Sequence, residues 1–244
     1  DHLTEAHPNT PIVLDMPVFS PLSSNSNVIV VLEDTVWTGS VDLTGKIVQI
    51  GHDATLTVSS GTVVTGGSIE VLGSLIFDGT SESRVSLTDV ALSVQNKDAS
   101  RSASIDMHFT DMLRGSYGMA NQGTHSVTDS NWDSLTDYIY LWYPKSDVLI
   151  ARNVFKDIRE FSVGTDASGS VTFENNLFYD TTEATTWTKP SIVNWAAYDA
   201  PVTVINNSFM NTSRVAVELE KGYQNAAIDA SNNWFATTDL DEIN

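Results

Sequence analysis

The chain of 244 residues contains no cysteine. This absence excludes a disulfide scaffold, a thiolate metal site and a cysteine nucleophile. Basic residues are scarce, because 12 Lys and Arg stand against 31 Asp and Glu and give a formal net charge of −19. A surface this negative repels nucleic acid and anionic membranes and attracts cations, so no nucleic-acid partner is expected.

Long apolar runs and helical patterns are missing as well. No segment approaches the roughly 18 apolar residues of a membrane helix, so we expect a soluble chain without membrane insertion. Short apolar alternations such as Thr55–Val58 and Ser68–Val71 recur instead, separated by Gly, Asn, Asp and Ser. Period-two alternation rich in β-branched residues predicts strands. The sequence therefore indicates an all-β fold.

A repeat of fixed length organises most of the chain. Large aromatic residues recur at a constant spacing of 23 (132−109, 155−132 and 178−155) at four positions: Phe109, Trp132, Phe155 and Phe178. The series continues with longer steps to Phe209 (209−178 = 31) and to Phe235 (235−209 = 26). A constant period indicates one structural unit that is repeated and stacked. With three short strands per unit, we predict a single right-handed parallel β-helix of roughly nine coils over residues 28–244.

The segment 1–27 differs from the rest of the chain. Four prolines, Pro8, Pro11, Pro17 and Pro21, disfavour regular helix or central strand there. We therefore predict that residues 1–27 are a lead-in and N-terminal cap. Because Asp1 is not preceded by Met or by a basic-then-apolar leader, we expect a processed or excised segment of a larger protein.

Several stretches resemble a known family. The alternations within 54–64 and 72–80 look like the opening coils of secreted bacterial parallel β-helix proteins, and 232–239 is similar to the last coil of pectate-lyase-like repeat domains. The resemblance implies the same fold and a secreted or cell-surface location. It does not choose a function, because the family includes lyases, hydrolases, epimerases, adhesins and binding modules.

Aligning the coils on the aromatic residues gives columns of equivalent positions. Two residues before the aromatic lies a column of asparagines: Asn153, Asn176, Asn207 and Asn233. Asparagine tolerates left-handed backbone angles, and stacked amides can hydrogen-bond from coil to coil. We predict a structural ladder at this turn.

The same alignment predicts an acidic corner. It comprises five carboxylates: Asp137, Asp157, Glu160, Asp180 and Glu183. Like charges on adjacent strands are unfavourable and favour a counter-ion, and hard oxygen ligands with flexible geometry suit Ca²⁺. The alternative is that these side chains extend into water, with Arg159 or Lys156 neutralising part of the charge.

Aromatic residues also cluster in and after the strand at 138–143. They are candidates for stacking on the apolar faces of sugar rings: Tyr138, Tyr140, Trp142, Tyr143, Trp187, Trp195 and Tyr198. The later ones lie in or near the insertion that lengthens the interval between Phe178 and Phe209. Alternatively, Tyr138, Tyr140 and Trp142 point inward, because they share columns with Phe161 and Val163.

Three functions remain open. A regular array with little room for cleft-forming loops favours a noncatalytic carbohydrate-binding or adhesin module of a larger secreted protein, with a polysaccharide or cell-surface glycan as partner and Ca²⁺ as the assisting cation. The second hypothesis is a polysaccharide lyase acting on a uronic-acid glycan, with Lys145, Arg159 or Lys189 as base. The third is a structural spacer between other domains.

Overall fold

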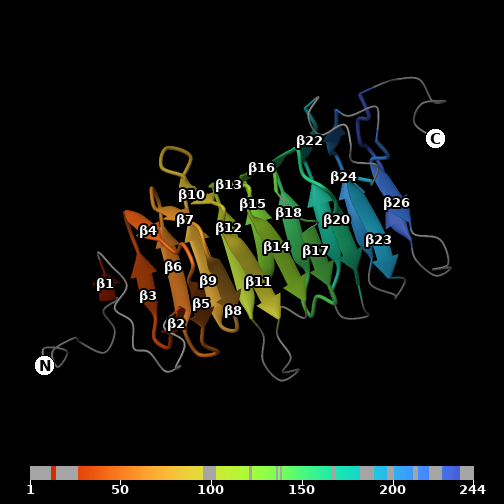
Figure 1. Ribbon diagram of the computed structural model, residues 1–244. Coiled ribbons are helices and arrows are strands. Elements are labelled where there is room, and N and C mark those ends of the chain that lie inside the picture. Colours follow the sequence, from red (N-terminus) through yellow and green to blue (C-terminus); the bar gives the residue numbers. More distant parts are fainter. Residues whose placement is uncertain are drawn as a thin grey trace, which may run out of the picture.

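The computed structural model describes the chain in the following ranges: 12–14, 27–95, 103–120, 123–135, 137, 139–165, 169–181, 190–196, 201–210, 214–219 and 227–236. These residues form strands and turns without a helix, and the strands build three parallel sheets. Figure 1 shows the sheets running side by side along an elongated solenoid. The prediction of an all-β parallel solenoid with three strands per coil is confirmed.

Each coil contributes one strand to each sheet. Sheet A has ten strands: β1 (Ile12–Leu14), β3 (Thr35–Trp37), β6 (Thr55–Ser59), β9 (Ser74–Asp78), β12 (Ser104–His108), β15 (His125–Thr128), β18 (Val148–Ala151), β21 (Val171–Glu174), β24 (Val202–Ile205) and β27 (Ile228–Asp229). Sheet B has nine: β2 (Val28–Val31), β5 (Ile47–Ile50), β8 (Ser68–Val71), β11 (Ala91–Gln95), β14 (Ser116–Ala120), β17 (Ile139–Trp142), β20 (Phe161–Gly164), β23 (Ile192–Ala196) and β26 (Val217–Leu219). Sheet C has eight: β4 (Ser40–Asp42), β7 (Val63–Thr65), β10 (Val85–Thr88), β13 (Thr110–Leu113), β16 (Asn131–Asp133), β19 (Val154–Lys156), β22 (Leu177–Tyr179) and β25 (Ser208–Phe209).

The solenoid makes about seven turns, slightly fewer than the roughly nine predicted. Eight stacked strands in sheet C enclose seven intervals from the first coil to the last. The strands are shortest toward the C-terminus, where β25 and β27 have two residues each.

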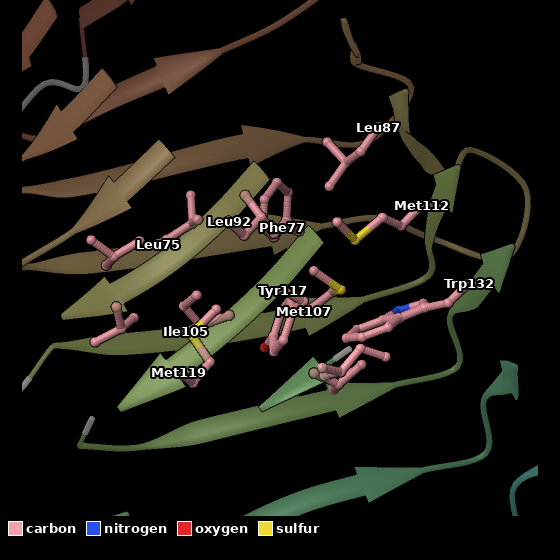
Figure 2. Packing of buried hydrophobic residues seen from close by; sticks show 14 of the residues in the cluster. Leu75, Phe77, Leu87, Leu92, Ile105, Met107, Met112, Tyr117, Met119 and Trp132 are labelled. Atoms are coloured by element: carbon pink, nitrogen blue, oxygen red, sulfur yellow. The ribbon is translucent and has the colours of Figure 1, made fainter. Parts of the chain in front are cut away.

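Alternate residues of each strand point into the solenoid. In β6, Leu56 and Val58 are fully buried, whereas the alternating Thr55 and Thr57 face outward. This is the pleat that period-two alternation predicts. Inward side chains of all three sheets meet along the axis, and Figure 2 shows Met107, Tyr117 and Trp132 converging in this interior. The buried residues form one continuous core along the solenoid, and each coil packs against the coils before and after it.

The aromatic column begins one coil later than the spacing predicts. Trp132 pairs with Met112 of the preceding coil, a step of 20 in sequence (132−112), and not with Phe109. Phe109 lies at the corner between β12 and β13 with a left-handed φ of 42°, beneath the guanidinium of Arg84 at 5.7 Å. Corner residues do not point into the core as strand residues do, so the first interval of the aromatic series does not correspond to a coil.

From Trp132 onward the column is an aromatic stack. Ring centroids of successive members lie 5.5, 4.8, 4.8 and 5.6 Å apart along the series Trp132, Phe155, Phe178, Phe209 and Phe235. The last two pairs are nearly parallel, with interplanar angles of 13° and 8°. These rings fill the same core position in consecutive coils, as the repeat predicts.

The asparagine ladder is confirmed, and it binds the coils at the corner between sheets A and C. Each ladder amide donates to the Oδ1 of the next, over 3.0, 2.9 and 3.1 Å along Asn153, Asn176, Asn207 and Asn233. Backbone N–H groups of the ladder residues donate to the same oxygens. The left-handed positions are the preceding residues: Arg152, Asn175, Asn206 and Asn232. The ladder asparagines therefore serve through their amides rather than through left-handed backbone.

Candidate functional site

The acidic corner forms with a different register from the predicted one. Sheet B advances by a step of 22 between β17 and β20, because Ile139 pairs with Phe161 (161−139). Asp137 consequently lies beside Arg159, with Oδ1 and Nη1 3.8 Å apart, rather than in line with Glu160. The prediction that Asp137 stacks on Glu160 is wrong by one position, because successive coils are 22 residues apart here and the prediction assumed 23. Glu183, the fifth predicted carboxylate, lies outside the described residues.

Other carboxylates of this corner are held by protein donors. Asp157 accepts hydrogen bonds from the backbone N–H of Thr181 at 2.6 Å and from its hydroxyl at 2.8 Å. Asp180 forms a buried ion pair with Arg214, with 3.1 Å between Oδ2 and Nη1. Because the Arg214 side chain is only 2% exposed, desolvation lowers the pKa of its guanidinium, opposed by the charge of Asp180.

Arg214 therefore supplies counter-charge at the corner where a cation was predicted. It also donates to three carbonyl oxygens from two segments: those of Ile158 and Arg159 in the turn before β20, and that of Pro190 before β23. In the part of the chain that the structure describes, no group of three or more His, Asp or Glu is arranged to hold a metal ion. Calcium binding at this corner stays a prediction, and of the described carboxylates Asp180 already has Arg214 as its partner.

The aromatic strand β17 faces both ways, and its exposed residues form the first candidate site. Ile139 and Leu141 are fully buried in the core, so Tyr140 and Trp142 occupy the alternate positions on the outer face of sheet B. Both are partly exposed. Tyr143 follows at the corner, 36% exposed, with its ring edge-on to Trp142 at 5.7 Å. Of the two orientations that the sequence left open, the structure shows the outward one for Tyr140 and Trp142.

Small residues surround these rings on the neighbouring strands. Tyr140 lies between Gly118 of β14 and Ser162 of β20 in the pairing register. A Cβ atom built on Gly118 would approach the Cζ atom of Tyr140 to 2.2 Å. Only glycine leaves this space, so the Tyr140 ring lies across the β14 backbone. One face of the ring is therefore supported by the sheet, as in a platform.

The remaining predicted aromatics do not all enter this platform. Trp195 is the additional residue of a β-bulge, because Val163 pairs with Asn194 whereas Gly164 pairs with Ala196. Tyr138, Trp187 and Tyr198 lie outside the described residues. The described platform therefore consists of Tyr140, Trp142 and Tyr143.

The candidate lyase bases do not converge. Lys145 lies in the turn that follows β17, whereas Arg159 lies in the turn that precedes β20, at the opposite end of the sheet B strands. Arg159 faces Asp137. Lys189 lies outside the described residues. Of the two described bases, Lys145 lies at the end of β17 where Tyr143 also lies, and Arg159 lies at the other end.

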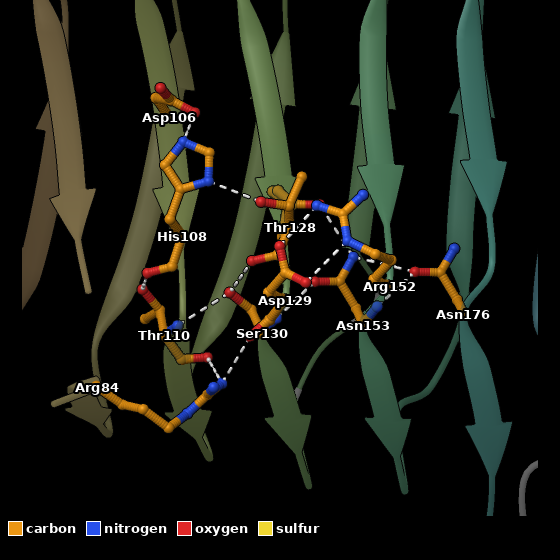
Figure 3. Close-up of polar contacts among 11 residues, drawn as sticks. Arg84, Asp106, His108, Thr110, Thr128, Asp129, Ser130, Arg152, Asn153 and Asn176 are labelled. Atoms are coloured by element: carbon orange, nitrogen blue, oxygen red, sulfur yellow. Dashed lines mark hydrogen bonds and ion pairs between the residues drawn. The ribbon is translucent and has the colours of Figure 1, made fainter. Parts of the chain in front are cut away.

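A polar network on the outer face of sheet A is a second candidate that the sequence did not bring together. Asp106 and His108 lie on β12, and Thr128 lies opposite His108 on β15. The Nε2 atom of His108 is 2.9 Å from Asp106 Oδ1, and its Nδ1 atom is 2.7 Å from the Thr128 hydroxyl (Figure 3). The neighbouring Asp129 binds Arg152 through two hydrogen bonds of 2.8 and 2.7 Å, which lower the pKa of Asp129.

This network joins coils rather than presenting a free base. Both ring nitrogens of His108 are engaged, and Thr128 is only 4% exposed. Figure 3 shows the contacts continuing into the asparagine ladder at Asn153. The alternation Asp-x-His was visible in the sequence, but the step from His108 to its partner Thr128 (128−108 = 20) is shorter than the period of the aromatic series.

No protein-family model matches the chain, and no curated protein or solved structure is significantly similar to it. The structure also shows, within its described ranges, no helix with the length and apolarity needed to cross a membrane.

Proposed function

We propose that this chain is a noncatalytic carbohydrate-binding or adhesin-type β-helix module of a larger secreted or cell-surface protein. Its pectate-lyase-like resemblance supports that setting, and its partner is a polysaccharide. The observation that carries the proposal is the platform of Tyr140, Trp142 and Tyr143 on the outer face of sheet B. Rigid aromatic rings stack on the apolar faces of sugars with little loss of conformational entropy.

The support beneath the rings strengthens the proposal. Tyr140 rests on β14 where Gly118 leaves room, and Trp142 and Tyr143 hold each other edge-on. A binding surface whose side chains are already ordered loses less entropy when the ligand arrives. The solenoid supplies this order, since β17, which carries Tyr140 and Trp142, is hydrogen-bonded to β14 on one side and to β20 on the other.

A lyase acting on uronic-acid glycans is the alternative activity, and the same samples test it. We expect no rise in the unsaturated-uronate absorbance when the protein is incubated with pectate, alginate or ulvan, because Arg159 faces Asp137 and the described outward positions of β14 and β17 carry no Lys or Arg. A rise that Lys145→Ala abolishes would replace the binding proposal by the lyase.

Binding is tested by calorimetry and affinity electrophoresis over a glycan panel. We expect Tyr140→Ala and Trp142→Ala each to weaken the affinity at least about tenfold, which corresponds to about 1.4 kcal/mol. Tyr179→Ala is the matched control, because Tyr179 is a partly exposed tyrosine on the outer face of sheet C. Failure to bind any glycan, or equal losses in the control, would leave the structural spacer as the better description.

A further inference from the structure

The outer face of sheet B carries two described acidic strand residues, Glu70 on β8 and Glu218 on β26, and the described outward positions of the strands between them are uncharged. Over β11, β14 and β17 the outward strand positions with described side chains are small, polar-neutral or aromatic: Ala91, Ser93, Ser116, Gly118, Ala120, Tyr140 and Trp142. Among these positions none is Asp, Glu, Lys or Arg. The first charged position toward the N-terminus is Glu70 on β8, in register with Ser93 and hydrogen-bonded to Gln49 at 2.8 Å.

In the same coils the other two sheets carry charged residues. Sheet A carries Asp106, whose carboxylate contacts His108, and sheet C carries Asp111, Asp133 and Lys156, each in an ion pair. In these coils charge therefore lies on sheets A and C, whereas the described outward positions of β11, β14 and β17 carry none. Charged side chains keep a surface solvated. An uncharged surface over β11, β14 and β17 with exposed aromatic rings is therefore typical of a binding site.

The accessible part of this face has a defined extent. Ser162 and Val193 continue the column of Tyr140 on β20 and β23, but they are only 3% and 2% exposed. The open surface that carries the rings therefore ends at β17 on the C-terminal side, and Glu70 of β8 borders its uncharged part on the other. Neighbouring strands are about 4.8 Å apart, so three strands provide a flat area of a few sugar units along the solenoid axis.

We propose that this face binds an uncharged glycan that lies across β11, β14 and β17, and that it discriminates against polyanionic glycans. The inference rests on the proposed function and specifies its ligand. Carboxylates of a polyuronate need Arg or Lys partners with directed hydrogen bonds, and the described outward positions of these strands offer none. The acidic chain as a whole, together with Glu70 at the border, repels a polyanion further. Neutral pyranose rings instead stack on Tyr140 and Trp142.

The experiment compares neutral hexasaccharides of glucose, mannose, xylose and galactose with hexamers of galacturonate and mannuronate, at about 20–200 mM salt, a range over which screening changes strongly. We expect at least one neutral hexamer to bind at least about tenfold more tightly than either uronate hexamer, with affinity that changes little with salt. Tyr140→Ala should weaken that binding at least about tenfold, whereas Tyr179→Ala should not.

A charge variant separates this inference from the function on which it rests. Ser93 is partly exposed on the same face, so Ser93→Arg should raise uronate affinity several-fold, and the gain should diminish with salt. Uronate hexamers that bind the unaltered protein more tightly than every neutral hexamer, through Tyr140, would overturn the inference and keep the carbohydrate-binding function. No binding of any hexamer would overturn both.

Discussion

His125 gives the sharpest test of the structure, because an ionisable side chain is enclosed in the core of the solenoid. It is 1% exposed on the inner face of β15, and its Nε2 atom lies 2.8 Å from the hydroxyl of Tyr117. The rings meet edge-on at 5.6 Å. Burial lowers the pKa of His125 from 6.5 to about 3, since the surroundings cannot solvate the imidazolium.

The sign of the pH dependence follows from linkage. The folded-state pKa lies below the unfolded-state value, so the unfolded chain binds this proton more readily in acid. Stability from the neutral ring is therefore present above about pH 6.5 and is lost as the pH falls toward about 3. At about 1.36 kcal/mol per pH unit, the loss from this one residue is about 2 kcal/mol at about pH 5.

The assay is urea unfolding followed by tryptophan fluorescence between about pH 7.5 and about pH 5. The reference is the double variant Tyr117→Phe/His125→Leu, which removes the titrating ring without leaving the Tyr117 hydroxyl unpaired. Titration of the 31 acidic residues is common to both proteins and cancels in the difference. Over this range the free energy of unfolding should fall by about 2 kcal/mol more in the unaltered protein. A difference that does not vary with pH would refute the buried, neutral histidine.

The remaining predictions concern contacts between coils. Arg214→Met leaves Asp180 buried without its partner, so the free energy of unfolding should fall by about 3–5 kcal/mol in urea titrations. Asn176→Ala removes one amide of the ladder and leaves backbone groups unpaired, which should cost about 1–3 kcal/mol by the same measurement. Gly118→Ala forces the Tyr140 ring away from β14, so it should cost about 1–3 kcal/mol and also weaken glycan binding.

Matched controls accompany these variants. Asn175→Gly changes an exposed left-handed residue next to the ladder, and it should preserve stability within about 0.5 kcal/mol. Asp137→Asn removes the exposed carboxylate that faces Arg159 at 3.8 Å, and the cost should stay within about 1 kcal/mol. Equal losses of unfolding free energy for Asn175→Gly and Asn176→Ala would contradict the ladder. A small loss for Arg214→Met would contradict the buried ion pair between Arg214 and Asp180.

Much of the fold could be predicted from the sequence because its determinants are local or strictly periodic. Alternation within strands such as Thr55–Val58 reflects the pleat of each strand, and it predicts the all-β class without knowledge of any partner. Asn153 and Asn176 are one regular coil apart, so their ladder followed directly from the spacing. Stacked units of constant length place equivalent residues side by side.

The candidate site was harder to predict because corners vary in length. The step between coils is 20 at Thr128 (128−108) and 22 at Phe161 (161−139), both shorter than the spacing of the aromatic series. The assumption of a constant 23-residue repeat therefore placed Phe109 wrongly in the core column and did not predict the contact between Asp137 and Arg159. The distant Arg214 could not be foreseen at the acidic corner, because no periodic position connects it to Asp180.

The sequence by itself determined that this protein is a stack of β-coils, since hydrophobic alternation and a repeated length act within and between adjacent units. The tertiary structure alone decided which way Tyr140 and Trp142 face and which surface they share with Gly118. A shift of one residue at a corner reverses the faces of every residue in the following strand. The outward platform therefore depends on the register of the coils, which only the assembled solenoid fixes.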